Sequence, residues 1–494
     1  MTPFNALQER LAQVWGLNKP GIGVDHVLVA LPSFSVGESL LSHYAARIPA
    51  LEHRYLVAHF LLHRIAACEV AFLSCAAPGD EVLDYYTSLV PAAYRASVRS
   101  RFRNVVVRDE SPRPIAAKVL DRPDIIEALR ASFAGRPAYI EPWNVTEHEV
   151  ELAIQLDAPI YGTSPELRHI GYKSAGRRLF AKSGVPMPTG REDVRTLDDV
   201  VEAVATMCAA RPALAGFVIK HDDSGAGDGN AVISMREVCE MQTPRSGWPC
   251  WVRQKVADLP DWYLRDLSRG GVVEELITGT RFTSPSVQLD ISPFGDVLVV
   301  ATHEQVLGGQ TGQVYTGCRF PADPAYASDL AIYGTAIGKQ LARLGAVGRF
   351  SADFAASCDE RGRWELFALE VNLRKGGTTH PYAVLRNLVP GRYDAENGRW
   401  LLPDGTSRCY CSSDNVVDPE WTGLAPAAVI AAVDSSGLQF DYASGTGVVL
   451  HMLSCLAIDG RFGMTAIGRS PEHAAKLYTA AKVAVSEANV SRKK

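Results

Sequence analysis

The sequence carries its strongest signal at Glu370-Val371-Asn372-Leu373-Arg374-Lys375-Gly376-Gly377-Thr378-Thr379-His380-Pro381. The apolar run before it predicts the second strand of a hairpin whose first strand covers about 347–356. Side chains two apart on a strand share a face, so Glu370 and Asn372 point to one side and Asp353 can face them. Three oxygen ligands on a rigid hairpin suit Mg²⁺ when substrate phosphates and water complete its shell. This spacing alone fits a polar, solvent-facing strand edge better.

The residues directly after this strand pair two cations with a glycine turn and hydroxyls. Arg374 and Lys375 precede Gly376, and Thr378 follows two positions later. Arginine and lysine beside backbone N–H groups suit a phosphate or a carboxylate. We therefore predict that Arg374 acts in catalysis and that Lys375, Gly376 and Thr378 contact a substrate.

A glycine-rich segment lies between two further predicted strands, 217–220 and 231–233. Lys220 ends the incoming strand and can meet a phosphate, so we predict that it acts in catalysis with Arg374. Glycines let backbone N–H groups approach an anion closely. The residues that would do so here are Ser224, Gly225, Gly227 and Gly229. A plain flexible hairpin loop is the alternative, and the segment is not a Walker loop because no Gly-Lys-Ser/Thr opens a helix.

Two further signals involve charges in unusual places. Strand 272–277 carries Glu274 and Glu275, which is unusual unless they face solvent or a ligand, and a carboxylate there with the Leu276 backbone could contact adenine. An edge strand with a solvated face is the alternative. Lys173 opens a predicted helix over 174–183, where the helix dipole disfavours a cation unless an anion lies nearby. A surface lysine is the alternative there.

The first third of the chain predicts an α/β layer. Short apolar runs at 27–31, 70–73, 105–107 and 138–140 alternate with amphipathic segments, which argues for a mostly parallel sheet. Thr146 and Glu149 have capping-box spacing at the start of a helix. Gly21-Ile22-Gly23 precedes its strand, whereas a dinucleotide fingerprint follows one, so a nicotinamide site is not expected.

Composition bounds the remaining possibilities. The 494 residues have a formal net charge of −5, with acidic and basic residues interspersed, so no nucleic-acid partner is expected. No apolar run reaches transmembrane length, so no membrane association is expected. The ten cysteines are scattered, without zinc or redox spacing, and predict reduced thiols in a cytoplasmic protein.

The order of these signals along the chain carries more weight than any one of them. A lysine, a lysine with a glycine loop, a Glu-rich strand, an Asp and then Glu-x-Asn resembles the signature of ATP-grasp enzymes, shared with D-alanine–D-alanine ligase and its relatives. A closer resemblance is to the pheganomycin-type peptide ligases. It rests on the stretches 31–35, 144–147, 173–180 and 372–381, with 451–453 and 467–468 near the end.

The resemblance implies a fold and a domain division. The expected class is α/β with α+β elements, an ATP-grasp fold preceded by a Rossmann-like pre-ATP-grasp domain. The expected divisions are 1–160 for the pre-ATP-grasp domain, 161–390 for two ATP-clasping lobes, and 391–494 for a C-terminal α/β region.

The resemblance also implies roles for the residues above. Lys173 and Lys220 would contact ATP phosphates under the 224–229 loop, and the strand of Glu274, Glu275 and Leu276 would contact adenine. Asp353, Glu370 and Asn372 would hold magnesium, with two ions expected. Where many ATP-grasp ligases have a ribose-binding Glu, this chain has Arg281, so no ribose contact is assigned.

The implied reaction joins an amino-acid or small-peptide carboxylate to an amine through an acyl phosphate, releasing ADP and phosphate. His303, Glu304 and Gln305, after a predicted strand, are candidates for lining the carboxylate or amine pocket, with an ordinary connecting loop as the alternative. Two other functions stay open: an ATP-binding regulatory protein without ligation, and a carboxylate kinase or ligase with a non-amino-acid partner. A homodimer is the expected assembly if the chain is not a monomer.

Overall fold

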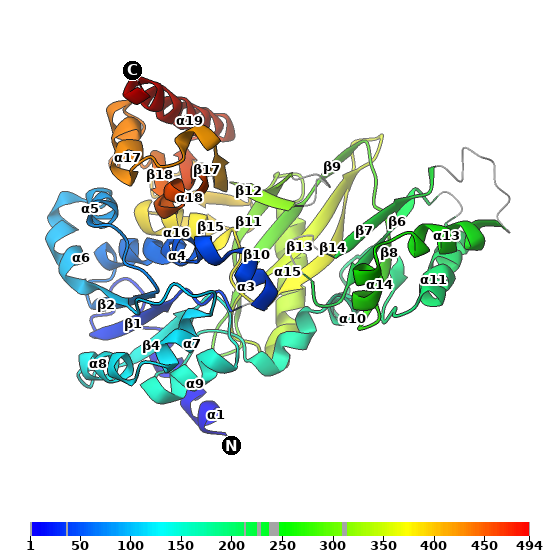
Figure 1. Ribbon diagram of the computed structural model, residues 1–494, viewed down its shortest axis with the longest axis horizontal. Coiled ribbons are helices and arrows are strands. Elements are labelled where there is room, and N and C mark those ends of the chain that lie inside the picture. Colours follow the sequence, from blue (N-terminus) through cyan, green and yellow to red (C-terminus); the bar gives the residue numbers. More distant parts are fainter. Residues whose placement is uncertain are drawn as a thin grey trace.

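The computed structural model describes residues 2–35, 38–211, 214–224, 229–236, 247–308 and 314–493. Figure 1 shows the N-terminal third at one end of an elongated molecule, the green 190–275 region at the other, and a long sheet between them. None of the described helices is long and apolar enough to cross a membrane.

The N-terminal third forms the predicted parallel sheet. Strands β1 (His26–Leu31), β2 (Cys68–Ser74), β3 (Phe102–Val106) and β4 (Ala138–Pro142) run parallel in the order β3-β2-β1-β4. Helices cover both faces of the sheet, so β1 is buried throughout and β2 and β4 nearly so, whereas the edge strand β3 is only partly buried. The helices are α1 (Pro3–Gln8), α2 (Leu11–Trp15), α3 (Glu38–His43), α4 (Ile48–His53), α5 (Asp80–Ser88), α6 (Arg95–Arg101), α7 (Ile115–Leu120), α8 (Pro123–Phe133) and α9 (Glu147–Leu156), with 3-10 turns η1 (Ala45–Arg47), η2 (Arg54–His63) and η3 (Ala92–Tyr94).

Local signals in this third are confirmed. α9 begins with the capping box of Thr146 and Glu149. The segment after α4, one of the amphipathic segments between the strands, folds as the 3-10 helix η2.

A small antiparallel sheet follows. It has the order β5-β8-β6-β7, from β5 (Gly190–Arg191), β8 (Gly271–Glu275), β6 (Gly216–His221) and β7 (Asn230–Ser234). The predicted hairpin on either side of the glycine-rich segment is confirmed, with Lys220 opposite Asn230. The elements around the sheet are η4 (Pro165–Gly171), α10 (Lys173–Ser183), α11 (Leu197–Ala210), α13 (Trp248–Ala257) and α14 (Asp261–Leu267). α10 ends at Gly184, whose left-handed φ of 66° needs no side chain.

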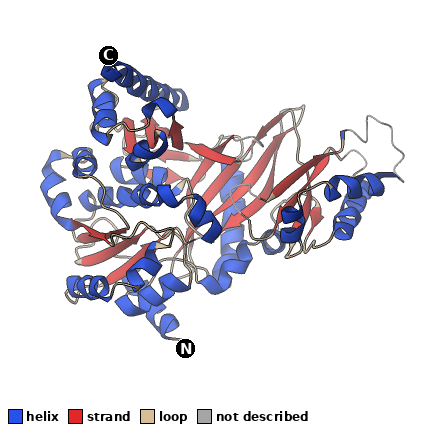
Figure 2. Ribbon diagram, in the orientation of Figure 1, coloured by secondary structure: helices blue, strands red, loops and turns tan. Residues whose placement is uncertain are grey.

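A second, larger antiparallel sheet forms the middle of the molecule. Its described path is β14-β13-β10-β11-β12-β17-β16-β15, and β9, β18 and β19 attach to it. The strands are β9 (Arg281–Thr283), β10 (Pro285–Ile291), β11 (Val297–Gly308), β12 (Val314–Phe320), β13 (Gly348–Cys358), β14 (Trp364–Asn372), β15 (Arg392–Asp394), β16 (Arg399–Leu401), β17 (Ser407–Val417), β18 (Gly447–His451) and β19 (Arg461–Gly468). Figure 2 shows its long strands beside those of the smaller sheet.

Helices cover this sheet and continue it into the C-terminal region. α15 (Ala327–Arg343) packs on β10 and β11. The others are α16 (Thr379–Leu388), η6 (Pro419–Trp421), α17 (Pro426–Ser435), η7 (Leu453–Cys455), α18 (Leu456–Asp459) and α19 (Pro471–Lys493). Because β17 pairs with β12, the sheet crosses residue 390, and one apolar core joins the N-terminal and C-terminal regions. The divisions after residues 160 and 390 therefore stay predictions.

Candidate active site

A cavity of about 530 Å³ lies between the two antiparallel sheets. Its size falls in the range of small-molecule sites, ~300–1,000 Å³. One part of the wall is apolar, with Pro188, Val218, Leu276, Ile277, Phe282, Leu307, Ala355 and Leu369. The remainder is polar or charged and includes Lys173, Lys220, Glu274, Glu275, Gln305, Asp353, Glu370, Asn372 and Arg374. An apolar wall beside convergent charges suits a planar base joined to an anionic tail.

The three predicted magnesium ligands meet on one wall of this cavity. Asp353 on β13 pairs directly with Glu370 on β14, and Asn372 Nδ2 donates to Asp353 Oδ2 at 3.2 Å. Lys173 Nζ forms an ion pair with Glu370 Oε1 at 3.0 Å. The tertiary structure thus favours a ligand-facing edge over a solvent-facing one.

The electrostatics of this wall favour a bound cation. Burial first, and the charge of Glu370 second, raise the pKa of Asp353 to about 7. Gln305 donates a hydrogen bond to Asp353 and opposes that rise. Two carboxylates and an amide oxygen form a donor set suited to Mg²⁺. The residues therefore fit the ion that the sequence predicts.

A second carboxylate on the opposite sheet is fully compensated. Glu274 accepts from Arg177 Nη1 at 2.8 Å through Oε1 and pairs with Lys220 Nζ at 2.5 Å through Oε2. Burial alone would raise the pKa of Glu274, but the charges of Lys220 and Arg177 outweigh it and hold the pKa below its ordinary value. Lys220 lines the cavity, so the ion pair fixes its ammonium group there.

The neighbouring Glu275 and Leu276 line the same wall. Glu275 accepts from the Thr189 N–H at 2.8 Å and from Arg211 Nη1 at 2.6 Å. The Leu276 N–H donates to the Gly216 carbonyl at 2.9 Å. Within the described residues, the Leu276 carbonyl accepts no backbone hydrogen bond outside the strand ladders and can meet a ligand. This geometry brings the predicted adenine strand to the apolar part of the cavity.

The glycine-rich loop is described only at its two ends. Lys173 Nζ donates to the Ser224 carbonyl at 3.0 Å, which ties the loop to the start of α10. Gly229 has φ +90°, and a Cβ there would lie 2.9 Å from His221 Nδ1, so glycine is required where the loop rejoins β7. Gly225 and Gly227 lie outside the described residues.

The loop after β14 divides its side chains between the cavity and the N-terminal third. Arg374, Gly376 and Thr378 line the cavity. Lys375 is buried and points away, with Nζ 2.6 Å from Glu141 Oε1 on β4. Lys375 therefore links the loop to the parallel sheet. The sequence analysis expected it to contact a substrate, but its side chain does not line the cavity.

Glycine at 377 is also required by packing. A Cβ at this position would lie 2.5 Å from Tyr315 Cε1, and the Tyr315 ring lines the cavity. The ring packs directly on the loop backbone, so any larger side chain at 377 would displace it.

Of the three consecutive substrate candidates on β11, Gln305 alone reaches this cavity. His303 is buried and bonds to the Tyr410 hydroxyl through Nε2 at 2.6 Å, and burial lowers its pKa to about 3. Glu304 bonds to the Tyr326 hydroxyl and to the Asp323 N–H, and it lines a different cavity. Alternation along the strand separates Glu304 from Gln305.

Arg281 lies away from this cavity wall. Its guanidinium is 5.0 Å from the centre of the Trp364 ring, and Nη2 donates to Cys358 Sγ at 3.3 Å. The missing ribose-binding carboxylate is therefore not replaced by this side chain.

Sequence reasoning missed two groups that position the site. Arg177 donates to Glu192, Glu274 and the Pro188 carbonyl, so it joins α10 to β8. The first N–H groups of α10 have no partner within the helix. Asp222 accepts from two of them, from Ser174 through its side chain at 2.8 Å and from Lys173 through its carbonyl at 3.2 Å. The signal for Arg177 was its helical spacing from Lys173, which places both on one helix face.

A second cavity, of about 360 Å³, adjoins the first. Its wall includes Ser35, Asn144 and Thr146 from the N-terminal third, and Thr163, Ser164, Arg168, Tyr172, Asp222, Asp223 and Ser224 from the segment that follows. Glu370, Asn372 and Arg374 line both cavities. The predicted metal wall is thus shared between two binding spaces.

Comparison with known proteins places the chain among ATP-grasp proteins. A family model described as "IQCH-like, ATP-grasp" matches residues 165–247 and 254–395, and one for the "PGM1 C-terminal domain" matches 428–481. The chain is 32% identical over 386 residues to L-propargylglycine–L-glutamate ligase of Streptantibioticus cattleyicolor, covering 77% of each protein. It is 24% identical over 355 residues to IQ motif-containing protein H of Danio rerio, covering 62% of this chain and 33% of that protein.

Solved structures share the fold at low sequence identity. The biotin carboxylase domain of Hydrogenobacter thermophilus 2-oxoglutarate carboxylase superposes with a TM-score of 0.52 at 14% identity, covering 92% of this chain and 89% of that one. Biotin carboxylase of Campylobacter jejuni gives a TM-score of 0.51 at 14% identity, covering 93% and 90%. The expected ATP-grasp architecture is confirmed.

Proposed function

The chain belongs to the ATP-grasp carboxylate–amine ligases of the pheganomycin type, and on that basis we propose that it joins an amino-acid or short-peptide carboxylate to the amine of a second amino acid or peptide. Amide formation driven by ATP is the activity of the family. The amino-acid class of both substrates is our proposal, supported by a relative whose name gives two amino acids.

The reaction proceeds in two balanced steps. A carboxylate oxygen of the first substrate attacks the γ-phosphorus of ATP, the bond to the β,γ-bridging oxygen breaks, and ADP leaves. The amine nitrogen of the second substrate then attacks the carbonyl carbon of the acyl phosphate. Inorganic phosphate leaves, and the amine loses a proton as the amide forms. The protein's part is positioning and charge compensation, without an enzyme nucleophile.

One observation carries the placement of this chemistry: Glu370, Asn372 and Arg374 line both cavities. We place adenine against the apolar wall of the larger cavity and the triphosphate toward the shared wall. We place the carboxylate substrate in the 360 Å³ cavity. The γ-phosphoryl group and the attacking carboxylate then meet at the shared wall.

Each charged residue has a proposed role in this arrangement. Lys173 and Lys220, with the 224–229 loop, bind the phosphates, and Arg374 stabilises the negative charge that develops on the transferred phosphoryl group. Asp353, Glu370 and Asn372 would hold magnesium, two ions in our proposal. Bound there, magnesium would neutralise phosphate charge and act as a Lewis acid.

The second cavity has walls suited to a polar substrate. Ser35, Asn144 and Thr146 come from the N-terminal third, and Arg168, whose guanidinium pairs with Asp223, lies at the other side. We propose this division of labour for the predicted domains: 1–160 supplies part of the substrate pocket, 161–390 binds ATP, and 391–494 supports the larger sheet. The protein acts as a homodimer in this proposal, which light scattering tests.

The activity is tested by incubating the protein with ATP, Mg²⁺ and pooled amino acids, and by measuring ADP and amide products by mass spectrometry. Amide with one ADP per bond is expected. Hydroxamate formation on adding hydroxylamine, without amide, would instead favour a carboxylate kinase. Nucleotide binding without ADP release would favour the non-ligating regulatory protein.

The assignment of the two cavities has its own test. Val218→Trp fills the apolar wall and is expected to raise KM for ATP at least tenfold with little effect on KM for the carboxylate substrate. Arg168→Met is expected to do the reverse. Equal effects of both variants on both constants would contradict the assignment.

A further inference from the structure

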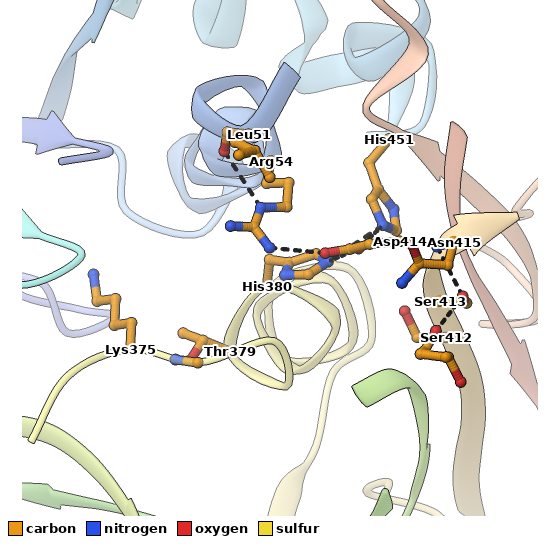
Figure 3. A network of polar contacts seen from close by, with 12 residues as sticks. Leu51, Arg54, Lys375, Thr379, His380, Ser412, Ser413, Asp414, Asn415 and His451 are labelled. Carbon is orange, nitrogen blue, oxygen red and sulfur yellow. Dashed lines mark hydrogen bonds and ion pairs between the residues drawn. The ribbon is translucent and has the colours of Figure 1, made fainter. Parts of the chain in front are cut away.

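Three side chains, two of them fully buried, converge outside both cavities from segments far apart in the sequence. His380 lies in the first turn of α16, Asp414 on β17 and His451 at the end of β18. Figure 3 shows both imidazole rings directed at the Asp414 carboxylate. His380 Nε2 and His451 Nε2 each lie 2.8 Å from Asp414 Oδ1 and 3.2 Å from each other.

Hydrogen bonds alone explain this triangle poorly. The three distances give an angle of about 70° at Asp414 Oδ1 between the two nitrogens, well below the separation of the two lone-pair directions of a carboxylate oxygen. Two N–H groups aimed at one oxygen from this angle bring their protons close together. A cation in place of both protons removes that repulsion.

The same atoms have the spacing of metal ligands. An ion about 1.1 Å above the plane of the triangle lies about 2.0–2.1 Å from all three atoms, the bond length of zinc to imidazole nitrogen and carboxylate oxygen. The histidines are buried, and 11% of the Asp414 side chain is exposed, so competing bulk water is restricted. Two imidazoles and one carboxylate form a set that suits Zn²⁺ and neighbouring transition metals.

The second oxygen of Asp414 is already held. Arg54 Nη1, on η2, donates to Asp414 Oδ2 at 2.8 Å, which leaves Oδ1 to face the two histidines. A hydrogen bond to the non-ligating oxygen orients a monodentate carboxylate. His451 also lines a cavity of about 60 Å³ that offers space for water beside the cluster.

We propose that His380, Asp414 and His451 form a binding site for a divalent transition metal of the zinc class, separate from the magnesium wall. Three protein ligands leave a fourth position for water. The ion would join α16 to β17 and β18. α16 begins directly after the loop of Arg374, Gly376 and Thr378. By holding α16, the ion would also hold that cavity-lining loop in place. Its role is structural and positional.

Metal analysis of the untagged full-length protein, purified without chelators, tests the site directly. Inductively coupled plasma mass spectrometry is expected to find close to one zinc-class ion per chain. His451→Ala and Asp414→Asn are expected to lower this content at least tenfold. The matched control is His59→Gln, another buried histidine that bonds to Thr87 and lies outside the cluster. It should keep the metal.

A cobalt titration tests the site in wild-type protein, so it does not depend on whether the variants fold. Wild-type protein stripped with dipicolinate is titrated with Co²⁺ alone, and visible bands of four-coordinate cobalt that saturate at one equivalent are expected. Melting temperature should rise as Co²⁺ or Zn²⁺ binds, and added Mg²⁺ should not reproduce the rise. Wild-type protein that carries no more metal than His451→Ala, and gives no saturating cobalt band, overturns the proposal and leaves a hydrogen-bonded network only.

Discussion

Two carboxylates on opposite walls of the 530 Å³ cavity have different electrostatic settings. Glu274 on β8 lies between Arg177 and Lys220, and its pKa is held below the ordinary value. Asp353 on β13 faces a second carboxylate, Glu370, and its pKa is raised to about 7. Two cations contact Glu274 directly, whereas Asp353 and Glu370 share one direct ion pair, from Lys173 to Glu370. We call the Glu274 wall compensated and the Asp353–Glu370 wall uncompensated, because on the latter two carboxylates share one lysine, which favours an added cation.

The largest effect is expected on the uncompensated wall. Asp353→Asn should lower amide turnover roughly a thousandfold, about 4 kcal/mol of transition-state stabilisation, because a metal ligand loses its charge. Folding, followed by circular dichroism, should be unaffected because the change removes repulsion with Glu370. Glu365→Gln, an exposed carboxylate on the neighbouring strand β14, is the matched control and should retain activity. Full turnover of Asp353→Asn would remove Asp353 from the metal site.

On the compensated wall, a large loss of stability is expected. Arg177→Met leaves Glu274 paired with Lys220 alone and removes the ion pair of Glu192. It should lower the free energy of unfolding by about 3 kcal/mol. Urea unfolding measures it. Arg191→Met, which breaks the exposed pair with Glu202, should cost no more than about 0.5 kcal/mol. Similar losses in both variants would contradict a special role for the buried pair.

A smaller effect is expected where the compensated wall meets the nucleotide. Lys220→Met should weaken binding of a non-hydrolysable ATP analogue about 30-fold, near 2 kcal/mol, because a phosphate loses its cation. Isothermal calorimetry gives the affinity. Lys182→Met, on the exposed side of α10, serves as the control and should bind normally. Unchanged affinity in Lys220→Met would restrict Lys220 to its ion pair with Glu274.

The smallest effect is a dependence of stability on pH without nucleotide or metal. The folded state keeps the Asp353 proton up to a pKa of about 7, whereas the unfolded chain loses it near 3.8. Between these values the folded state binds more protons, so stability falls as pH rises. The full pKa difference corresponds to ~4 kcal/mol of unfolding free energy. Because the cavity is open to water, we expect the free energy of unfolding to fall by only about 1 kcal/mol over this range.

Urea unfolding between pH 4.5 and 7.5 measures this slope. The slope should be flatter in Asp353→Asn than in wild type. Saturating Mg²⁺ with ATP should reverse the slope of the wild type, because the ion favours the ionised form of Asp353. A slope that is identical in wild type and Asp353→Asn would show that other groups carry the dependence.

Much of the fold followed from local patterns. The strands of the parallel sheet, the capping box at Thr146, and the end of α10 at Gly184 were predicted correctly because each depends on a few neighbouring residues. Side-chain alternation on β14 likewise placed Glu370 and Asn372 together. The 3-10 geometry of η2 was not predicted, because packing between the parallel sheet and α16 acts there.

The candidate site was predictable where its residues share a strand or a motif. Lys375 and His303 were placed by proximity to such motifs, and both point elsewhere: Lys375 reaches Glu141, and His303 reaches Tyr410. Neither partner lies within 100 residues of its own side chain in the sequence. Local sequence does not specify such distant pairs.

The resemblance in motif order identified the ATP-grasp architecture, and strand alternation identified the acidic hairpin, because alternation depends on near neighbours. The three-dimensional packing was needed to show that Glu274 is compensated and Asp353 is not, that two cavities share one wall, and that His380, Asp414 and His451 meet. Those features depend on which distant side chains become buried together, since burial weakens solvent screening and makes each neighbouring charge count.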